Sequence, residues 1–345
     1  MMNDYKNDPR YDDMLELSKV LDGSESMYIF PHMRADGDAI GACTALCTLM
    51  RSRGKTADIL MEDEVPENLR FMTKDYVTII KDSDTEMPKR DLCIALDCAG
   101  LERFPVREKI FLNAGRKTAS LDHHIQLKEK FADVNLIDSD AAAACELLYE
   151  FFIAMGYEIS TEVAESLYSG IVTDTSNFQN SNTTKKTHLI TAALYDYGID
   201  INKINITIFR SDRPQKLKLH SMIMNDMEYF CDHRATMAYV TLDMYREAEA
   251  YTNESDGINS QLRDIKGVEV AVFLREAKPG EIKAGFRSKE YMDVAALCAE
   301  FDGGGHKHAA GCTIYGKTMK EALDLMREAV TKEMEKYDKR TDKPA

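Results

Sequence analysis

Short runs rich in β-forming residues alternate with helical patterns through the first 200 residues, and this alternation most limits the folds open to the chain. Strand-like runs separated by segments with a 3.6-residue apolar period are typical of βαβ units. The predicted strands are residues 27–31, 56–61, 77–80, 91–97 and 117–122, and the predicted helices are residues 38–53, 141–155 and 161–172, with a further helix capped by Thr183 or Thr184. The pattern therefore predicts an α/β fold with a parallel sheet.

The second half of the chain has a different order. Residues 198–214 are polar and helix-breaking and predict a linker, and residues 216–230 predict a connecting helix. Strand patterns then predict a smaller α/β domain; they cover residues 235–242, 267–274 and 282–287. A single core usually stops growing near roughly 250 to 300 residues. The 345 residues are therefore expected to divide into a first domain (1–197), a linker with a connecting helix (198–234) and a second domain (235–345), with a frayed tail over 332–345.

Charge is divided unequally between the two halves. Residues 1–200 hold 21 basic and 35 acidic side chains, a net charge of −14, whereas residues 201–345 hold 23 and 24, a net charge of −1. Proteins that bind long DNA or RNA usually present a basic face, because neutralising phosphates supplies most of the affinity. The charge balance therefore disfavours a long nucleic acid as partner and leaves a small anionic ligand open.

Hydropathy gives an expectation about location. No apolar run approaches the ~18 uncharged residues that cross a bilayer, and residues 1–10 contain no apolar signal core. We therefore expect a cytoplasmic protein that contacts no membrane. The eight cysteines form no Cys-x-x-Cys pair, and we expect them to be reduced core residues.

Acidic and histidine side chains stand at the ends of predicted elements. Ligands of open α/β sheets gather where strands end, at their carboxyl side. The positions are His32, Asp36, Asp38, Asp97, Asp122, His123, His124 and, after a predicted helix, Asp174. Converging carboxylates would repel one another, and divalent cations remove that conflict. Carboxylate and imidazole donors without a thiolate suit Mn²⁺, with Co²⁺, Fe²⁺ or Zn²⁺ as substitutes and Mg²⁺ less well.

Each of these positions also has a plainer interpretation when taken alone. Asp38 follows an Asp-Gly turn dipeptide and could simply cap its helix, and a lone Asp97 or Asp174 is more often a cap or turn residue than a ligand. It is the conjunction of all four segments that favours a metal site.

A second candidate site lies in the second half of the chain. Gly303, Gly304 and Gly305 precede His306, and consecutive glycines allow backbone N–H groups to approach an anion closely. The predicted strand 282–287 ends at Arg287, whose guanidinium can bind phosphate through two N–H groups. The alternative is that the glycines only turn the chain and that Arg287 is a solvated surface residue.

Together these segments resemble the DHH phosphoesterase family. The likeness rests on the ordered motifs over roughly residues 27–190, and on a Gly-Gly-Gly-His loop and Arg-Ser pair like those of the DHH-associated C-terminal domain. It implies two metal ions, usually Mn²⁺, with His32 and Asp36 on one, Asp38, His123 and Asp174 mainly on the other, and Asp97 as the bridge. It also implies that His124 faces the phosphate, that Asp122 supports the site, and that the substrate is bound by Arg287, Ser288, Gly304, Gly305 and His306.

The resemblance implies hydrolysis of a phosphate ester by water held between the two cations. A two-domain chain is most similar to the stand-alone oligoribonucleases of the family, which degrade nanoRNA and linear dinucleotides such as pApA to mononucleotides. Many of them also convert 3′-phosphoadenosine 5′-phosphate to AMP, and they suggest a homodimer. Two alternatives with the same chemistry are a cyclic di-AMP phosphodiesterase and an inorganic pyrophosphatase. An alternative of another class is an inactive nucleotide-binding regulatory protein.

Overall fold

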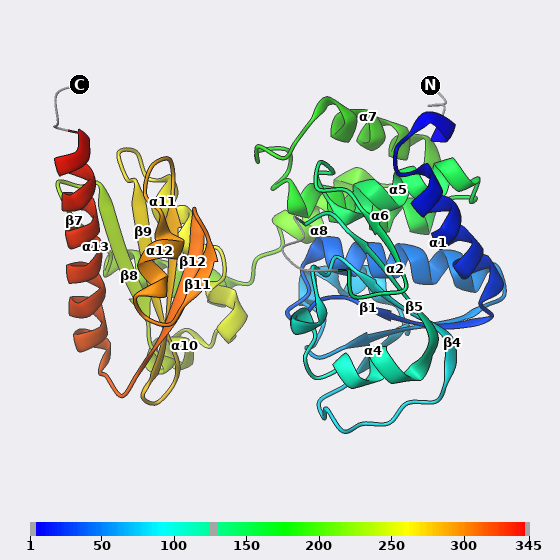
Figure 1. Ribbon diagram of the computed structural model, residues 1–345. Helices are drawn as coiled ribbons and strands as arrows, with labels where there is room; N and C mark the ends of the chain where they lie inside the picture. Colours follow the sequence, from blue (N-terminus) through cyan, green and yellow to red (C-terminus); the bar gives the residue numbers. More distant parts are fainter. Residues whose placement is uncertain (1–4, 125–129, 342–345) are drawn as a thin grey trace. The chain divides into compact units, whose positions relative to one another are not determined.

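The computed structural model describes residues 5–124 and 130–341. They form two compact units, of which the first ends at Ser211 and the second begins at Asp212 (Figure 1). This boundary falls inside residues 198–234, so the segment predicted as a linker and connecting helix is divided between the two units. None of the helices in the described part of the chain combines the length and apolarity needed to span a bilayer.

The first unit is built on a six-stranded sheet in the order β3-β2-β1-β4-β5-β6, and all neighbouring strands run parallel. Its strands are β1 (Ser26–Phe30), β2 (Thr56–Met61), β3 (Val77–Ile79), β4 (Arg90–Leu96), β5 (Gly115–Asp122) and β6 (Val134–Ile137). The central strands are apolar along their length, as expected for a parallel sheet covered on both faces. The predicted α/β fold with a parallel sheet is confirmed.

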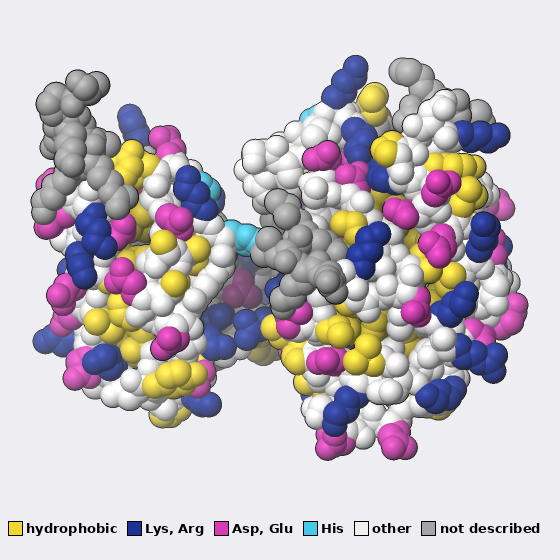
Figure 2. Space-filling model, viewed as in Figure 1, with side chains coloured by type: hydrophobic (Ala, Val, Ile, Leu, Met, Phe, Trp, Pro, Cys, Tyr) yellow, Lys and Arg dark blue, Asp and Glu magenta, His cyan; other side chains and the backbone are white. Residues whose placement is uncertain are grey.

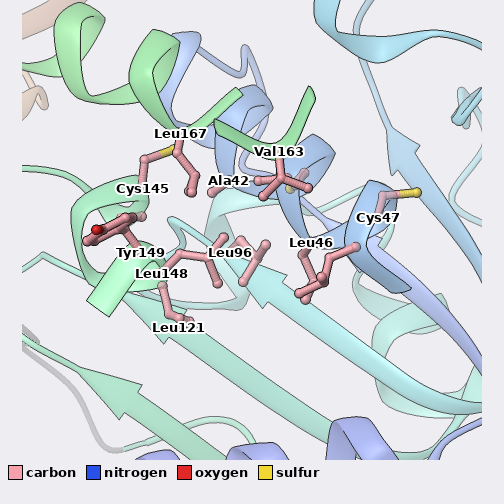
Figure 3. Packing of buried hydrophobic residues seen from close by; sticks show 14 of the residues in the cluster. Ala42, Leu46, Cys47, Leu96, Leu121, Cys145, Leu148, Tyr149, Val163 and Leu167 are labelled. Carbon is pink, nitrogen blue, oxygen red and sulfur yellow. The ribbon is translucent and has the colours of Figure 1, made fainter. Parts of the chain in front are cut away.

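Helices cover both faces of this sheet. One face carries the larger apolar core, in which Leu96 and Leu121 from two strands meet Leu148 and Leu167 from two helices (Figure 3). The helices on this face are α1 (Tyr11–Gly23), α2 (Gly37–Ser52), α5 (Ala144–Met155) and α6 (Thr161–Asp174). The opposite face packs through Phe30 and Phe111 against α4 (Glu108–Ala114). The unit also contains α3 (Arg70–Thr73), α7 (Lys185–Leu194) and α8 (Ile201–Phe209).

The second unit contains a six-stranded mixed sheet in the order β11-β12-β10-β9-β8-β7, in which β8 and β9 are parallel and the other neighbours antiparallel. Its strands are β7 (Glu228–Phe230), β8 (Ala235–Val240), β9 (Val270–Lys278), β10 (Glu281–Ser288), β11 (Gly304–His306) and β12 (Ala309–Tyr315). Helices α12 (Val294–Ala299) and α13 (Met319–Thr341) pack on one face. Helices α9 (Pro214–Asn225), α10 (Leu242–Ala248) and α11 (Ile258–Asp264) pack on the other.

Three predicted segments differ from the structure. The predicted linker 198–214 contains α8, because the Asp200 side chain caps the helix through the Lys203 N–H (3.0 Å) and Ile204 is buried in the core. The predicted helix 216–230 ends at Asn225, and β7 follows because it pairs with β8. The tail predicted to fray from residue 332 is helical to Thr341 within α13, which is anchored by buried apolar side chains such as Met334.

Surface charge is mixed on the face of each unit seen in Figure 2, where acidic and basic side chains are interspersed among small hydrophobic groups. Single-sign surfaces are the usual mark of proteins that bind long nucleic acids.

Candidate metal centre

The first unit brings its predicted ligands together at the carboxyl edge of the sheet. The loop after β1 carries His32 and Asp36, β4 ends just before Asp97, β5 ends just before His123, and α6 ends with Asp174. Asp38 comes from the first turn of α2. Because parallel strands end on the same side of a sheet, residues distant in the sequence reach one place.

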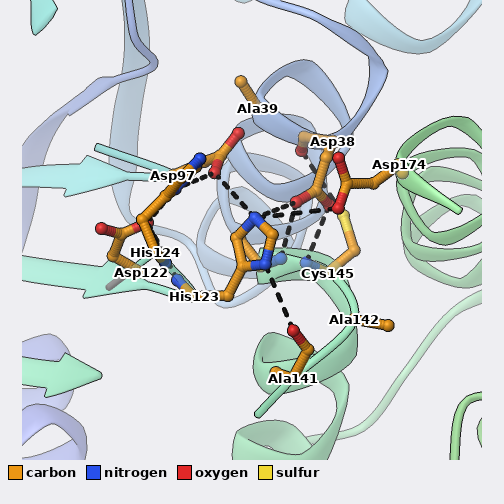
Figure 4. Close-up of polar contacts among 12 residues, drawn as sticks. Asp38, Ala39, Asp97, Asp122, His123, His124, Ala141, Ala142, Cys145 and Asp174 are labelled. Atoms are coloured by element: carbon orange, nitrogen blue, oxygen red, sulfur yellow. Dashed lines mark hydrogen bonds and ion pairs between the residues drawn. The ribbon is translucent and has the colours of Figure 1, made fainter. Parts of the chain in front are cut away.

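Two groups of possible ligands share Asp97. One consists of His32, Asp36 and Asp97, and the other of Asp97, His123 and His124. A third group, Asp38 with His123 and Asp174, shares His123 with the second. Within each group the ligand atoms lie within 4.8 Å of one another. His32 Nε2 is 3.5 Å from Asp97 Oδ2, whereas His123 Nε2 is 3.4 Å from Asp97 Oδ1. The two oxygens of one carboxylate therefore face two different imidazoles, and Figure 4 shows His123 between Asp97 and the pair Asp38 and Asp174.

Asp97 is held by the backbone rather than by side-chain hydrogen bonds. Its carboxylate is buried, its N–H donates to Leu121 O (3.0 Å), and its φ of 58° lies in the left-handed region, where aspartate is among the tolerated residues. Among the described residues, none donates a well-formed hydrogen bond to its buried Oδ1. A buried carboxylate oxygen without a donor is costly, and a cation in this position would satisfy it.

The imidazoles are oriented by backbone carbonyls. His32 Nδ1 lies 2.7 Å from Met33 O, and His123 Nδ1 lies 3.3 Å from Ala141 O. Because a carbonyl can only accept, these contacts place the proton on Nδ1 and leave Nε2 toward the carboxylates. Metal-binding histidines in proteins are typically oriented in this way.

Asp38 is fixed by the start of α5. Its two carboxylate oxygens accept hydrogen bonds from the N–H groups of Ala144 (2.6 Å) and Cys145 (3.0 Å). Space for this carboxylate depends on Gly170 of α6, since a Cβ at that position would clash with Cys145 and lie 2.8 Å from Asp38 Oδ1. The contact between α2 and α6 thus sets the place of the ligand.

Asp122 supports the neighbouring histidines from beneath. The side chain is fully buried, and its Oδ1 accepts from the His123 N–H (2.9 Å) and lies 2.9 Å from His124 Nδ1. The His124 side chain keeps 39% of its surface exposed and lies beside Asp97. Asp122 thereby sets the direction of the one imidazole at this edge that is open to solvent.

Electrostatics at this edge favour bound cations. Burial disfavours the charged imidazolium of His32, but the carboxylates of Asp36 and Asp97 outweigh this effect and raise its pKa to about 10. Burial also disfavours the charged form of His123, but the Asp97 carboxylate outweighs it and raises the pKa of His123 to about 10. Burial raises the pKa of Asp174 to about 6, and burial with the nearby charges of Asp97 and Asp174 raises the pKa of Asp38. The cluster thus stabilises positive charge strongly, and its oxygen and nitrogen donors suit Mn²⁺ and related ions.

Two cysteine thiols lie behind the site and are expected to be unreactive. Cys98 follows Asp97, and the Cys145 thiol lies 3.5 Å from the backbone oxygen of Asp38. Burial raises the pKa of both thiols well above its usual value, so they stay protonated. The candidate donors in this cluster are therefore carboxylates and imidazoles.

Asn182 is a residue at this site that the sequence patterns did not indicate. Its Nδ2 lies 3.3 Å from Asp174 Oδ2 and donates to Ala142 O (2.9 Å), so it ties a ligand to the loop before α5. An asparagine within a polar Asn-Ser-Asn-Thr-Thr stretch reads as a turn residue, and only its position two residues before the α7 cap sets it apart.

In the second unit, the predicted substrate residues do not all face one space. Arg287 and Gly304 line a cavity of about 650 Å³. Gly305 and His306 continue along the exposed edge strand β11. Ser288 is buried, and its hydroxyl donates to Met292 O (2.7 Å) and lies 2.9 Å from His308 Nδ1, so its contacts are with the fold.

Family models match both units of the chain. The DHH family, N-terminal domain, matches residues 26–171, and the DHHA1 domain matches residues 235–336. The chain carries a DHH-family N-terminal domain followed by a DHHA1 domain. The first match covers the sheet that carries the candidate metal centre, and the second covers the mixed sheet with the cavity.

Relatives match the DHH chain over nearly its full length. A protein of Thermus thermophilus named bifunctional oligoribonuclease and PAP phosphatase NrnA is 28% identical over 95% of this chain and 96% of its own. A Bacillus subtilis protein of the same name is 25% identical and covers 93% of this chain and 99% of its own.

Solved structures share the fold of this DHH chain. An exopolyphosphatase-related protein of Bacteroides fragilis superposes with a TM-score of 0.85 at 25% identity, over 93% of this chain and 96% of that one. The exonuclease RecJ bound to manganese has a TM-score of 0.55 at 13% identity, over 93% and 94% of the two chains.

Proposed function

We propose that this DHH protein is a metal-dependent phosphoesterase that hydrolyses short oligoribonucleotides, including linear dinucleotides such as pApA, to mononucleotides. We also propose that it converts 3′-phosphoadenosine 5′-phosphate to AMP. The observation that carries the proposal is the sharing of Asp97 between two groups of carboxylates and imidazoles. The names of relatives that match most of the chain support the choice of substrate.

The proposed ligands divide as the geometry groups them. His32 and Asp36 would hold one divalent cation, Asp38, His123 and Asp174 the other, and Asp97 both. We propose Mn²⁺ for both positions. When bound, such a pair supplies Lewis acidity and an activated water for in-line displacement at phosphorus.

The protein groups around this pair have separate roles. Asp122 holds His124 through Nδ1, which leaves Nε2 on the solvent-facing side, where it can donate to a non-bridging phosphate oxygen. The carbonyls of Met33 and Ala141 keep the other two imidazoles turned toward the carboxylates. These contacts exist before substrate arrives, so little reorganisation is needed on binding.

The second unit is proposed to bind the part of the substrate that does not react. Arg287 and Gly304 line its cavity, and Gly305 and His306 extend from Gly304 along β11. Ser288 is proposed to act by fixing the end of β10 through His308.

The test is product analysis with the purified chain. Labelled RNA oligomers of two to ten nucleotides and 3′-phosphoadenosine 5′-phosphate are incubated with Mn²⁺, with Mg²⁺ or with a chelator. We expect mononucleotides from the shortest oligomers and AMP from the bisphosphate, only with a divalent ion. Pyrophosphate and cyclic di-AMP are run beside them, and faster hydrolysis of either would replace the proposed substrate. Binding of nucleotides without turnover under any metal would favour a regulatory protein.

A further inference from the structure

Three glycines form a bare strip across the sheet of the second unit. Gly304 on β11 lies opposite Gly311 on β12, which lies opposite Gly285 on β10, and Phe273 on β9 continues the same row. Residues directly opposite one another share a face of the sheet, and neighbouring strands lie ~4.8 Å apart, so the strip is roughly 10 Å long. Glycine inside a strand weakens it and often marks close approach by a ligand.

The protein's own packing does not account for two of these glycines. Neither Gly304 nor Gly285 has a positive φ. A Cβ on Gly304 would meet nothing within 4 Å, and a Cβ on Gly285 would come within 3.4 Å only of the Asn259 side-chain nitrogen, at 3.0 Å. The glycines therefore keep a flat space open rather than relieve a clash inside the chain.

This strip is the floor of the 650 Å³ cavity, whose lining includes all three glycines. Helices α9 to α11 cover the same face of the sheet over β8 and β9, where Ala271 and Phe273 are buried. Asn259 at the start of α11 and Phe273 on β9 also line the cavity, and the Asn259 side-chain nitrogen is the atom nearest to a Cβ placed on Gly285, at 3.0 Å. A planar ring system fits a floor of this shape, with backbone beneath it and an aromatic ring at its end.

Cations stand on both sides of the strip. Lys283 lies two residues before Gly285 and Arg287 two residues after it, on the same face of β10 and each roughly 7 Å from it along the strand, and both line the cavity. Within the described ranges 5–124 and 130–341, neither forms an ion pair with a carboxylate. Arg275, opposite Lys283 on β9, is paired with Asp256 (3.1 Å). Asp302 at the rim is exposed to solvent.

We infer that Lys283 gives this cavity a preference for a nucleotide that carries phosphate on both sides: with the base on the glycine strip and one phosphate at Arg287, the other phosphate lies at Lys283. The inference rests on the proposed function in one respect, which is that the ligand is a nucleotide. A 3′,5′-bisphosphate or an internal nucleotide of an oligomer engages both cations, whereas a mononucleotide engages one. The cavity therefore favours substrate over the mononucleotide product and makes Lys283 a specificity-determining residue.

The experiment measures equilibrium binding by calorimetry to the full chain with a chelator present, so that no turnover occurs. The ligands are 3′-phosphoadenosine 5′-phosphate, 5′-AMP and 3′-AMP. We expect the bisphosphate to bind about tenfold more tightly than either monophosphate, the effect of one added charged hydrogen bond. Lys283→Met should remove the advantage of the bisphosphate over the monophosphate whose phosphate lies at Arg287, and leave the affinity for that monophosphate within about twofold of the wild type. Lys278→Met is the matched control, because Lys278 pairs with Glu281 and does not line the cavity.

The floor is tested with Gly304→Val, which adds bulk where the chain has no neighbouring atoms and should leave the melting temperature unchanged. It should weaken binding of all three ligands. Equal affinity of the wild type for bisphosphate and monophosphates, no binding at millimolar concentrations, a bisphosphate advantage that survives Lys283→Met, or full binding by Gly304→Val would each overturn the inference.

These outcomes are separate from those of the proposed function. If no oligonucleotide is hydrolysed with any metal but bisphosphate binding depends on Lys283, the proposed function fails and the inference stands. If hydrolysis is found and Lys283→Met leaves the bisphosphate preference intact, the inference fails and the proposed function stands.

Discussion

The two units handle charge in opposite ways. In the first, carboxylates converge at a buried edge of a parallel sheet, and the histidines among them are held in an environment that stabilises positive charge. In the second, Arg287 and Lys283 line an open cavity on the face of a mixed sheet, without a carboxylate partner among the residues described. Under the proposed function, the first unit would bind cations before an anion approaches it, whereas the second could bind an anion unaided.

The difference also lies in what the backbone contributes. The first site uses strand ends, so loops and helix starts supply its side chains and each ligand has its own support. The second uses the face of three neighbouring strands, where side chains are absent at Gly285, Gly304 and Gly311 and the sheet itself is the surface. Changes in the first unit should therefore act on turnover, and changes in the second on affinity.

The largest effect is expected for Asp97→Ala. Loss of a supporting contact behind a metal ligand typically costs about 10- to 100-fold, so loss of the carboxylate that both groups share should cost more than ~100-fold in kcat. Initial rates with Mn²⁺ and labelled dinucleotide measure this, and circular dichroism checks the fold. Asp12→Ala, at an exposed position of α1, is the control. Near-normal kcat for Asp97→Ala would contradict the proposal that two metal ions share this carboxylate.

An intermediate effect is expected for Asn182→Ala, which leaves Asp174 without its side-chain donor. We expect a loss of about 10- to 100-fold in rate at low Mn²⁺, partly recovered at high Mn²⁺, since the change acts on a ligand's orientation. The measurement is the Mn²⁺ concentration that gives half-maximal rate. Asn180→Ala serves as the matched control, because the Asn180 side chain donates to the backbone oxygen of Asp174 and to the Ser176 hydroxyl, and not to the Asp174 carboxylate. An unchanged Mn²⁺ dependence in the Asn182 variant would show that this tie is only structural.

The smallest effect is expected for Arg287→Ala, and it should change KM rather than kcat. Loss of one charged contact to a part of the substrate that does not react should raise KM about tenfold with kcat nearly unchanged. Steady-state kinetics with the dinucleotide separate the two constants. A fall in kcat comparable to that of the Asp97 variant would mean that the division between turnover and affinity is wrong.

Much of the first unit could be predicted because its strands are continuous apolar runs and its polar residues stand at their ends. Helix α1 was not among the predicted elements, although Met14, Leu17 and Leu21 have the three- and four-residue spacing of a helix face. Helix α8 was hidden because its isoleucines alternate with asparagine and threonine, which favour turns and strands as much as helices.

The supporting parts of the two sites could not be predicted in the same way. Met33 and Ala141 act through backbone carbonyls, which leave no mark on residue type. The glycine strip depends on strand register, because Gly285 and Gly311 become neighbours only when β10 and β12 pair. The Gly-Gly-Gly-His segment was visible as a loop, whereas its role as an edge strand depends on its pairing with β12.

The two thiols behind the metal centre have a consequence for ion selection. Copper and other thiophilic ions compete for most nitrogen and oxygen sites by sheer affinity, and a thiolate within reach would strengthen their hold. Cys98 and Cys145 are buried, and burial raises the pKa of both thiols, so neither would supply a thiolate that strengthens the binding of such ions. If the first unit binds metal ions as proposed, discrimination against soft metals would follow from which atoms the fold exposes, before any ion has arrived.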